Sequence, residues 1–180
     1  MSGLRNIKTL TIAGMLTGIA IISGFFKIAV SDILEIRFST LPIAVAGALL
    51  GPGVAGIVGA AGDIGAFLIR PTGPYFPGFT ISGALTGLIF GLCLYKKDGS
   101  SPGLLRVAVG VVINTVFVNL LLNSLWLTLL YGKGGLLAVL SVRFLKEIIM
   151  IPVNIILIMA ITGPVCSILK RSRSAPELLQ

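Results

Sequence analysis

Long apolar runs without a single charged residue are the feature of this 180-residue sequence that most constrains its fold. Such runs cover residues 9–26, 38–62, 71–95, 107–132 and 148–169. A helix needs roughly 20 residues to cross the hydrocarbon core of a bilayer. Only 11% of the residues are charged and the mean hydropathy is +1.06, whereas about a quarter of a soluble domain is charged. The sequence therefore predicts an integral membrane protein.

The second apolar run is too long for one helix once it continues to Ile69, and Gly51-Pro52-Gly53 interrupts it. Proline removes a backbone donor and glycine permits a turn, so the chain is expected to break there. The sequence thus predicts an all-α, polytopic bundle of six transmembrane helices, the second of them short. The predicted helices cover residues 10–29, 40–50, 54–69, 79–95, 104–131 and 141–169.

The length leaves room for a single membrane domain over residues 1–180, with short tails at about 1–8 and 171–180. Six spans place both termini on one side of the membrane. Most of the basic residues lie on that side, which is typical of the cytoplasmic face. We therefore expect a multi-pass protein of the cell membrane with both termini cytoplasmic. The net charge of +8 reflects this orientation better than it indicates nucleic-acid binding.

The absence of histidine limits the chemistry that this chain can perform. A zinc site is not expected, and neither is a mechanism that needs an imidazole base. The sequence also lacks the Gly-x-x-x-x-Gly-Lys-[Ser/Thr] phosphate loop. We expect no metal, no cofactor, no catalytic residue and no ATP hydrolysis in this chain.

Residues 62–80 combine an acid with an aromatic loop that contains three prolines. Asp63 lies inside a predicted helix, where an unpaired carboxylate is costly, so it must be paired, near water or bound to a ligand. A carboxylate accepts two parallel hydrogen bonds, which suits the amino and ring N–H groups of a pterin or guanine edge. One base and three rings follow it: Arg70, Tyr75, Phe76 and Phe79. The rings could stack on a ligand or anchor the loop in the membrane interface.

Asn119, Asn123 and Trp126 are spaced four and three residues apart. In an α-helix this spacing puts the two amides and the indole on one face. They could bind a ligand, but asparagine also joins membrane helices to each other, and tryptophan is common at the membrane interface.

Arg143 and Lys146 stand near the start of the last predicted helix and indicate an anion site. Two alternatives remain open from the sequence. Arg143 could pair with Glu147 one turn later, or both bases could belong to a solvated rim. Pro152 is expected to kink the same helix because it removes a backbone hydrogen bond.

Gly14 and Gly18 form a small-xxx-small pair in the first predicted helix. Such a pair lets another helix approach the backbone closely. The partner helix could belong to this chain or to another subunit.

Together these residues resemble the substrate-binding S components of energy-coupling factor (ECF) vitamin transporters, most closely the folate-specific members. The resemblance runs from about residue 10 to 169 and is carried by residues 14–18, 62–63 with 75–80, and 123–126 with Arg143 and Lys146. It implies a six-helix protein that captures a vitamin at the outer face and topples to release it inward. It also implies partners, a transmembrane coupling subunit and two cytoplasmic ATPases, reached through Gly14 and Gly18.

For a folate-specific member the resemblance implies a role for each candidate residue. Asp63 would bind the pterin edge, under a loop that serves as a lid and one wall. Four aromatic side chains would sandwich the flat rings: Tyr75, Phe76, Phe79 and Trp126. Two amides would bind the remaining heteroatoms: Asn119 and Asn123. Three bases would hold the glutamate carboxylates: Arg70, Arg143 and Lys146.

Other functions stay open at this point. An S component for riboflavin, thiamine or biotin would share the fold, although thiamine is a cation, riboflavin has no carboxylate and biotin has one. From other classes, the chain could be a standalone channel, an intramembrane enzyme or a structural membrane subunit. A channel would show a polar stripe along several helices, and many such enzymes use histidine.

Overall fold

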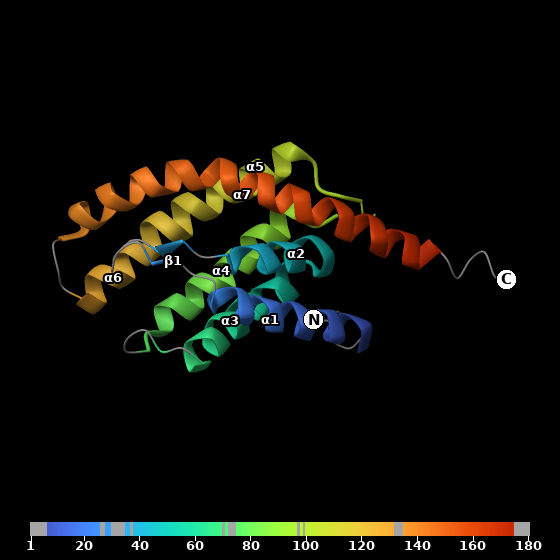
Figure 1. Ribbon diagram of the computed structural model, residues 1–180, viewed down its shortest axis with the longest axis horizontal. Helices are drawn as coiled ribbons and strands as arrows, with labels where there is room; N and C mark the ends of the chain where they lie inside the picture. The colour runs from blue at the N-terminus through green and yellow to red at the C-terminus, as the bar shows by residue number, and fades with distance from the viewer. Residues whose placement is uncertain are drawn as a thin grey trace.

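The apolar runs fold into helices that run side by side along the long axis of the molecule in the computed structural model (Figure 1). The structure describes residues 7–25, 28–29, 35–36, 38–69, 71, 75–96, 98, 100–131 and 135–174. Side chains are described for residues 7–24, 38–69, 71, 75–96, 98, 100–130, 144 and 146–168.

The described helices follow the order that the apolar pattern predicts. The first four are α1 (Ile7–Phe25), α2 (Thr40–Leu50), α3 (Pro52–Ile69) and α4 (Pro77–Leu94). The next three segments follow one another without a break: α5 (Leu104–Ile113), the π-helix η2 (Asn114–Leu122) and α6 (Asn123–Tyr131). The last helix is α7 (Gly135–Ser174). Two short strands between α1 and α2, β1 (Ile28–Ala29) and β2 (Glu35–Ile36), pair in antiparallel fashion.

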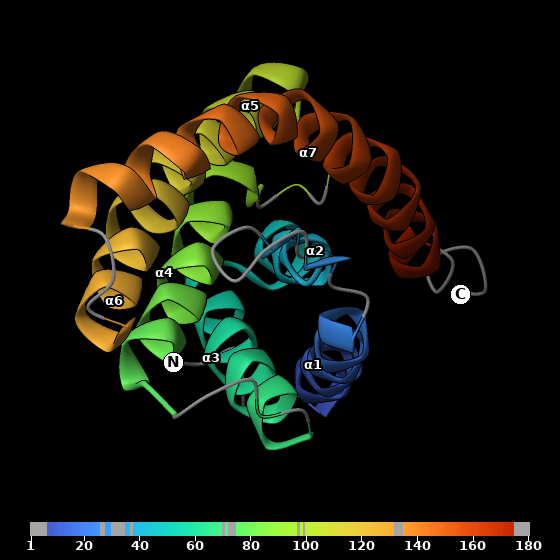
Figure 2. The ribbon, with the colours of Figure 1, turned by 60° about the vertical axis from the view of Figure 1, so that its left-hand side comes forward.

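Within the described ranges, five helices are long and apolar enough to cross a membrane. The shorter apolar helix α2 makes the sixth. Its 11 residues rise only about 16 Å at 1.5 Å per residue, roughly half of the hydrocarbon core. Residues 42–48 of α2 are buried, and Figure 2 shows this helix inside a ring of α1, α3, α4 and α7. The predicted six-helix, all-α membrane fold is therefore confirmed, with its short helix at the centre.

Helices α3 and α4 pack almost backbone to backbone because glycines line their contact. A Cβ atom built on Gly83 would lie 2.7 Å from the carbonyl oxygen of Gly59, and one on Gly87 would overlap the carbonyl oxygen of Ala55. Small residues permit such close approach between membrane helices. The contact also brings Asp63 of α3 next to α4, since its Cβ would lie 3.4 Å from a Cβ on Gly83.

Two predictions about the ends of α1 and α2 have opposite outcomes. The break at Gly51 is confirmed: this residue has φ = 83°, a backbone conformation that favours glycine. The extension of the first helix to residue 29 is wrong, because α1 ends at Phe25 and Ile28–Ala29 forms β1. Hydropathy alone does not separate a short strand from the last turn of a helix.

Helix α7 is longer than predicted at both ends, since it begins at Gly135 and continues to Ser174. Pro152 and Pro164 lie inside it, and it follows a curved path over the bundle (Figure 2). Proline inside a helix leaves one carbonyl without its backbone donor and favours bending. Helices α1 and α7 also extend into the segments predicted as tails, because Lys8 and residues 171–174 are helical.

Candidate functional site

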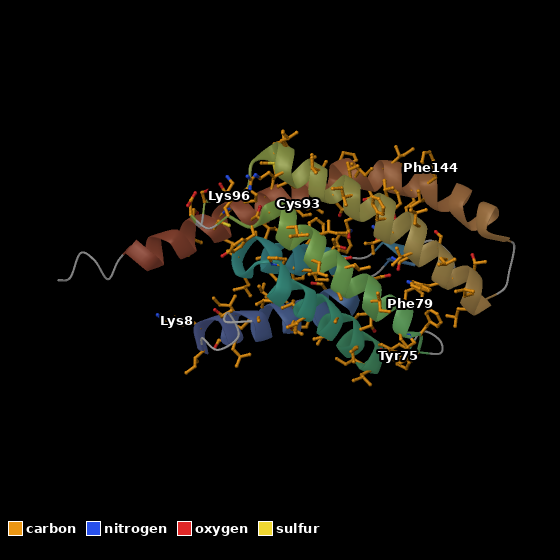
Figure 3. All side chains as sticks on the ribbon, turned by 180° about the vertical axis from the view of Figure 1, so that it is seen from behind. Lys8, Tyr75, Phe79, Cys93, Lys96 and Phe144 are labelled. Carbon is orange, nitrogen blue, oxygen red and sulfur yellow. The ribbon has the colours of Figure 1, made fainter. Side chains whose placement is uncertain are left out.

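The aromatic residues of the predicted loop lie at the end of the bundle away from the basic side chains predicted to face the cytoplasm. In Figure 3, Tyr75 and Phe79 are near one end, whereas Lys8 and Lys96 are near the other. The close packing of α3 on α4 puts Asp63 near the same end as Tyr75. This end of the bundle therefore contains the candidate site.

Asp63 is held by a chain of hydroxyl groups. Thr80 of α4 donates from Oγ1 to Asp63 Oδ2 at 3.0 Å, and the Tyr75 hydroxyl lies 2.9 Å from the same Oγ1. A threonine hydroxyl carries a single proton, so Tyr75 is the donor to Thr80 while Thr80 donates to Asp63. Asp63 and Thr80 are half-buried, and Tyr75 is 46% exposed. The carboxylate is thus paired inside the bundle, as its position in a membrane helix requires.

Three of the predicted aromatic side chains form one cluster at the start of α4. The ring centroid of Phe76 lies 5.4 Å from that of Trp126 and 6.1 Å from that of Phe79. Both separations fall in the range of favourable aromatic pairs. A Cβ atom on Gly78 would lie 2.7 Å from Cδ2 of Trp126 and would overlap the Phe76 ring. Glycine at this position therefore makes room for the two rings.

The fourth ring and the indole nitrogen make separate contacts. Tyr75 packs on Phe67 of α3, with ring centroids 5.1 Å apart. The Trp126 Nε1 group donates to Ser82 Oγ of α4 at 3.2 Å, and Ser82 is buried. This hydrogen bond fixes Trp126 against α4. A tryptophan that only anchors a helix in the membrane interface would not need such a partner.

The fifth span is not a uniform α-helix, because η2 is π-helical from Asn114 to Leu122. A π-helix bonds residue i to i+5, and such segments are frequent at functional sites. The α-helical face predicted for Asn119, Asn123 and Trp126 is therefore wrong for Asn119, which lies in η2, whereas Asn123 and Trp126 both belong to α6. Asn119 donates to Glu147 of α7 at 3.4 Å, whereas Trp126 donates to α4.

Asn123 offers a buried acceptor in α6, three residues before Trp126. Its Oδ1 atom is buried and has no hydrogen-bond partner within the described residues. An unsatisfied buried polar atom costs about 1–3 kcal/mol, so a ligand or a water molecule that donates here would remove a penalty. Asn114 Oδ1 and Ser124 Oγ are also buried without a hydrogen-bond partner among the described residues.

Glu147 connects η2 with the predicted anion site. It is 5% exposed, accepts from Asn119, and its Oε1 lies 3.6 Å from Nζ of Lys146. Lys146 thus has a carboxylate next to it. Arg143 belongs to α7, but its side chain lies outside the described set, and so does the whole of Arg70. The predicted Arg143–Glu147 pair and the roles of both arginines stay predictions.

Gly14 and Gly18 of α1 face no neighbour within the described chain. A Cβ atom on either would meet nothing within 4 Å. By contrast, a Cβ on Gly24 of the same helix would lie 3.1 Å from Ala66 of α3. The small-xxx-small pair therefore takes no part in the helix packing of the described residues.

Three residues of this network are not among those that the sequence pattern indicates as site residues: Thr80, Ser82 and Glu147. Thr80 ends the aromatic segment, and Ser82 follows it by two residues in an apolar run. Glu147 directly follows Lys146 and precedes the apolar run 148–169, and the sequence indicates it only as a partner for Arg143. A hydroxyl or acid inside a membrane span is the signal that could have found them.

The arrangement suits binding better than bond-breaking chemistry. The Asp63 carboxylate is hydrogen-bonded across the α3–α4 contact, a cluster of rings stands at the start of α4, and the Lys146 ammonium group lies on α7. Within the ranges described, no group of three metal-ligating side chains is found. These groups together can recognise a flat molecule that carries paired N–H donors and negative charge.

Comparison with known proteins gives consistent results. The family model described as the ECF transporter, substrate-specific component, matches residues 8–162. A folate transporter, FolT, of Clostridium novyi (strain NT) is 41% identical over 128 residues, which cover 71% of this chain and 72% of that relative. The folate transporter FolT of Leuconostoc mesenteroides subsp. mesenteroides is 32% identical over 130 residues, 69% of each chain.

A solved structure is also similar to this chain. The crystal structure of FolT bound with folic acid matches with a TM-score of 0.79 and 31% identity. The match covers 88% of this chain and 95% of the other. The likeness therefore includes almost the whole bundle.

Proposed function

This chain belongs to the family of ECF transporter substrate-specific components, and on that premise we propose that it captures folate at the outer membrane face for uptake. It is a multi-pass membrane protein. As a substrate-specific component it binds the cargo and has no enzymatic activity of its own. Energy comes from ATP hydrolysis in partner subunits.

One observation carries the choice of folate. Asp63 lies at the end of the bundle where Phe76, Phe79 and Trp126 cluster, so an acceptor for paired N–H groups lies near surfaces for a flat ring. The two curated relatives are folate transporters, and the similar solved structure contains folic acid. These likenesses support the same ligand class here.

In this proposal the pterin edge donates to Asp63, and Trp126, Phe76 and Phe79 hold the rings. Tyr75, which packs on Phe67, closes the side of the ring near α3. The Oδ1 of Asn123, which has no hydrogen-bond partner among the described residues, accepts from a remaining N–H group of the ligand, and Asn119 completes the polar wall toward α7. Lys146, with Arg70 and Arg143, binds the glutamate carboxylates.

The partner module is proposed to be a transmembrane coupling subunit with two cytoplasmic ATPases. The open surface at Gly14 and Gly18 supports docking through α1, because a neighbouring helix can approach the backbone there. Lys8 and Lys96, which lie near the same end of the bundle (Figure 3), then face the cytoplasm, and both termini are proposed to be cytoplasmic. No metal or resident cofactor takes part.

The test is equilibrium binding of folic acid and 5-formyltetrahydrofolate to the detergent-purified chain. We expect dissociation constants below micromolar. Riboflavin, thiamine and biotin serve as comparison ligands in the same assay and should bind at least about 100-fold more weakly, a difference of roughly 2.7 kcal/mol. The proposal is wrong if either folate binds no better than these vitamins.

A further inference from the structure

The hydroxyl chain at Asp63 joins three elements that the sequence separates. Asp63 belongs to α3, Thr80 to the first turn of α4, and Tyr75 precedes α4. Thr80 donates to Asp63 Oδ2 at 3.0 Å and Tyr75 lies 2.9 Å from Thr80 Oγ1. Of these three residues, Thr80 is therefore the one that contacts both Asp63 and Tyr75.

The direction of the protons follows from the chemistry of the groups. An ionised carboxylate only accepts hydrogen bonds, so the threonine proton points to Asp63. The second hydrogen bond of Thr80 then uses its lone pair and takes the proton of Tyr75. Hydrogen bonds to a charged group are the strong ones, and this bond restrains the rotation of the Asp63 carboxylate about its side chain.

We propose that Thr80 is a positioning residue for ligand recognition: it fixes the carboxylate of Asp63 for paired N–H donors and couples Tyr75 to that carboxylate. This inference rests on the proposed function, because Asp63 is there the acceptor for the pterin edge. Thr80 needs no contact with the ligand. Its hydroxyl acts through Asp63 on one side and through Tyr75 on the other.

The experiment compares Thr80→Val with Thr80→Ser in the full-length, detergent-purified chain. Valine keeps the shape of threonine and removes the hydroxyl, whereas serine keeps the hydroxyl. Each variant is titrated with folic acid and with an analogue whose 2-amino group is replaced by methyl. Thermal unfolding without ligand is measured in parallel, so that a loss of folding is seen directly.

We expect T80V to bind folic acid about 10-fold more weakly, the effect of a lost hydrogen bond to a charged group. Its preference for folic acid over the methyl analogue should shrink, because only folic acid donates through the 2-amino group. T80S should keep both the affinity and the preference of the unmodified chain. Equal weakening of both ligands, or no difference between T80V and T80S, would overturn the inference.

Tyr75→Phe tests the coupling separately. Y75F alone should weaken folic acid binding. Added to T80V it should have no further effect, because T80V already lacks the hydroxyl that accepts the proton of Tyr75. Additive effects would show that Tyr75 acts independently of Thr80. If the unmodified chain does not bind folic acid, the proposed function fails as well; if it binds and T80V is unchanged, only the role of Thr80 fails.

Discussion

At the scale of single residues, the candidate site is built from polar groups that pair with one another, within one helix or between helices. Lys146 is an example, because its ammonium group faces Glu147 at 3.6 Å and both side chains are mostly buried. A buried carboxylate next to a lysine offsets part of the positive charge that a ligand anion would experience. Glu147 also accepts from Asn119, so one acid serves two proposed ligand contacts.

This arrangement predicts that Glu147→Gln strengthens binding of the anionic ligand. Glutamine still accepts from Asn119 and removes the negative charge, so folic acid should bind about fivefold more tightly, roughly 1 kcal/mol of relieved repulsion. Binding of a pterin without the glutamate should stay unchanged. The measurement is isothermal titration of both ligands.

Lys146→Met is the matched control for the same pair of charges. It should weaken folic acid and leave the glutamate-free pterin unaffected. If E147Q shifted both ligands by the same factor, Glu147 would have a structural role and not an electrostatic one.

At the scale of elements, the contact between α3 and α4 positions the site. Glycines at this contact let Asp63 of one helix reach Thr80 of the other, at 3.0 Å. A larger residue in the contact would push the helices apart and move Asp63 away from the hydroxyl chain. The precision of the site thus depends on small side chains well inside the bundle.

Gly87→Ala is expected to destabilise the protein for this reason. A Cβ at Gly87 would overlap the carbonyl oxygen of Ala55, and overpacking of this kind costs about 1–3 kcal/mol. Gly53→Ala is the control, because a Cβ there meets nothing within 4 Å. Thermal unfolding in detergent should show a lower midpoint for G87A alone; equal midpoints for the two variants would contradict the proposed packing.

At the scale of the whole molecule, the proposed ligand site and the proposed docking surface are separate parts of one bundle. The proposed site uses α3, α4, η2, α6 and α7, whereas Gly14 and Gly18 lie on α1, which packs on α2 and α3. A substitution on the open side of α1 should therefore affect assembly without affecting capture.

Gly14→Leu combined with Gly18→Leu tests this separation. The leucines have room in the isolated chain, since both positions are open within the described residues, so folic acid affinity should be unchanged. Co-purification with the coupling subunit and folate uptake by cells should be lost. Gly14→Ala with Gly18→Ala keeps the surface small and should retain both. Normal uptake by the leucine variant would refute docking through this surface.

The apolar runs by themselves determined the membrane location, the six helices and the break at Gly51, because hydropathy and backbone geometry are local properties. The sequence also indicated Asp63 as a candidate, because an acid is costly inside an apolar helix, and Trp126, because of its spacing from Asn119 and Asn123. Only the tertiary structure decided that Asp63 pairs with Thr80, that Trp126 donates to Ser82 and that Glu147 joins Asn119. These contacts span 17, 44 and 28 residues of sequence. Helical spacing relates neighbours within one helix, so it cannot specify which residues of other helices complete the site.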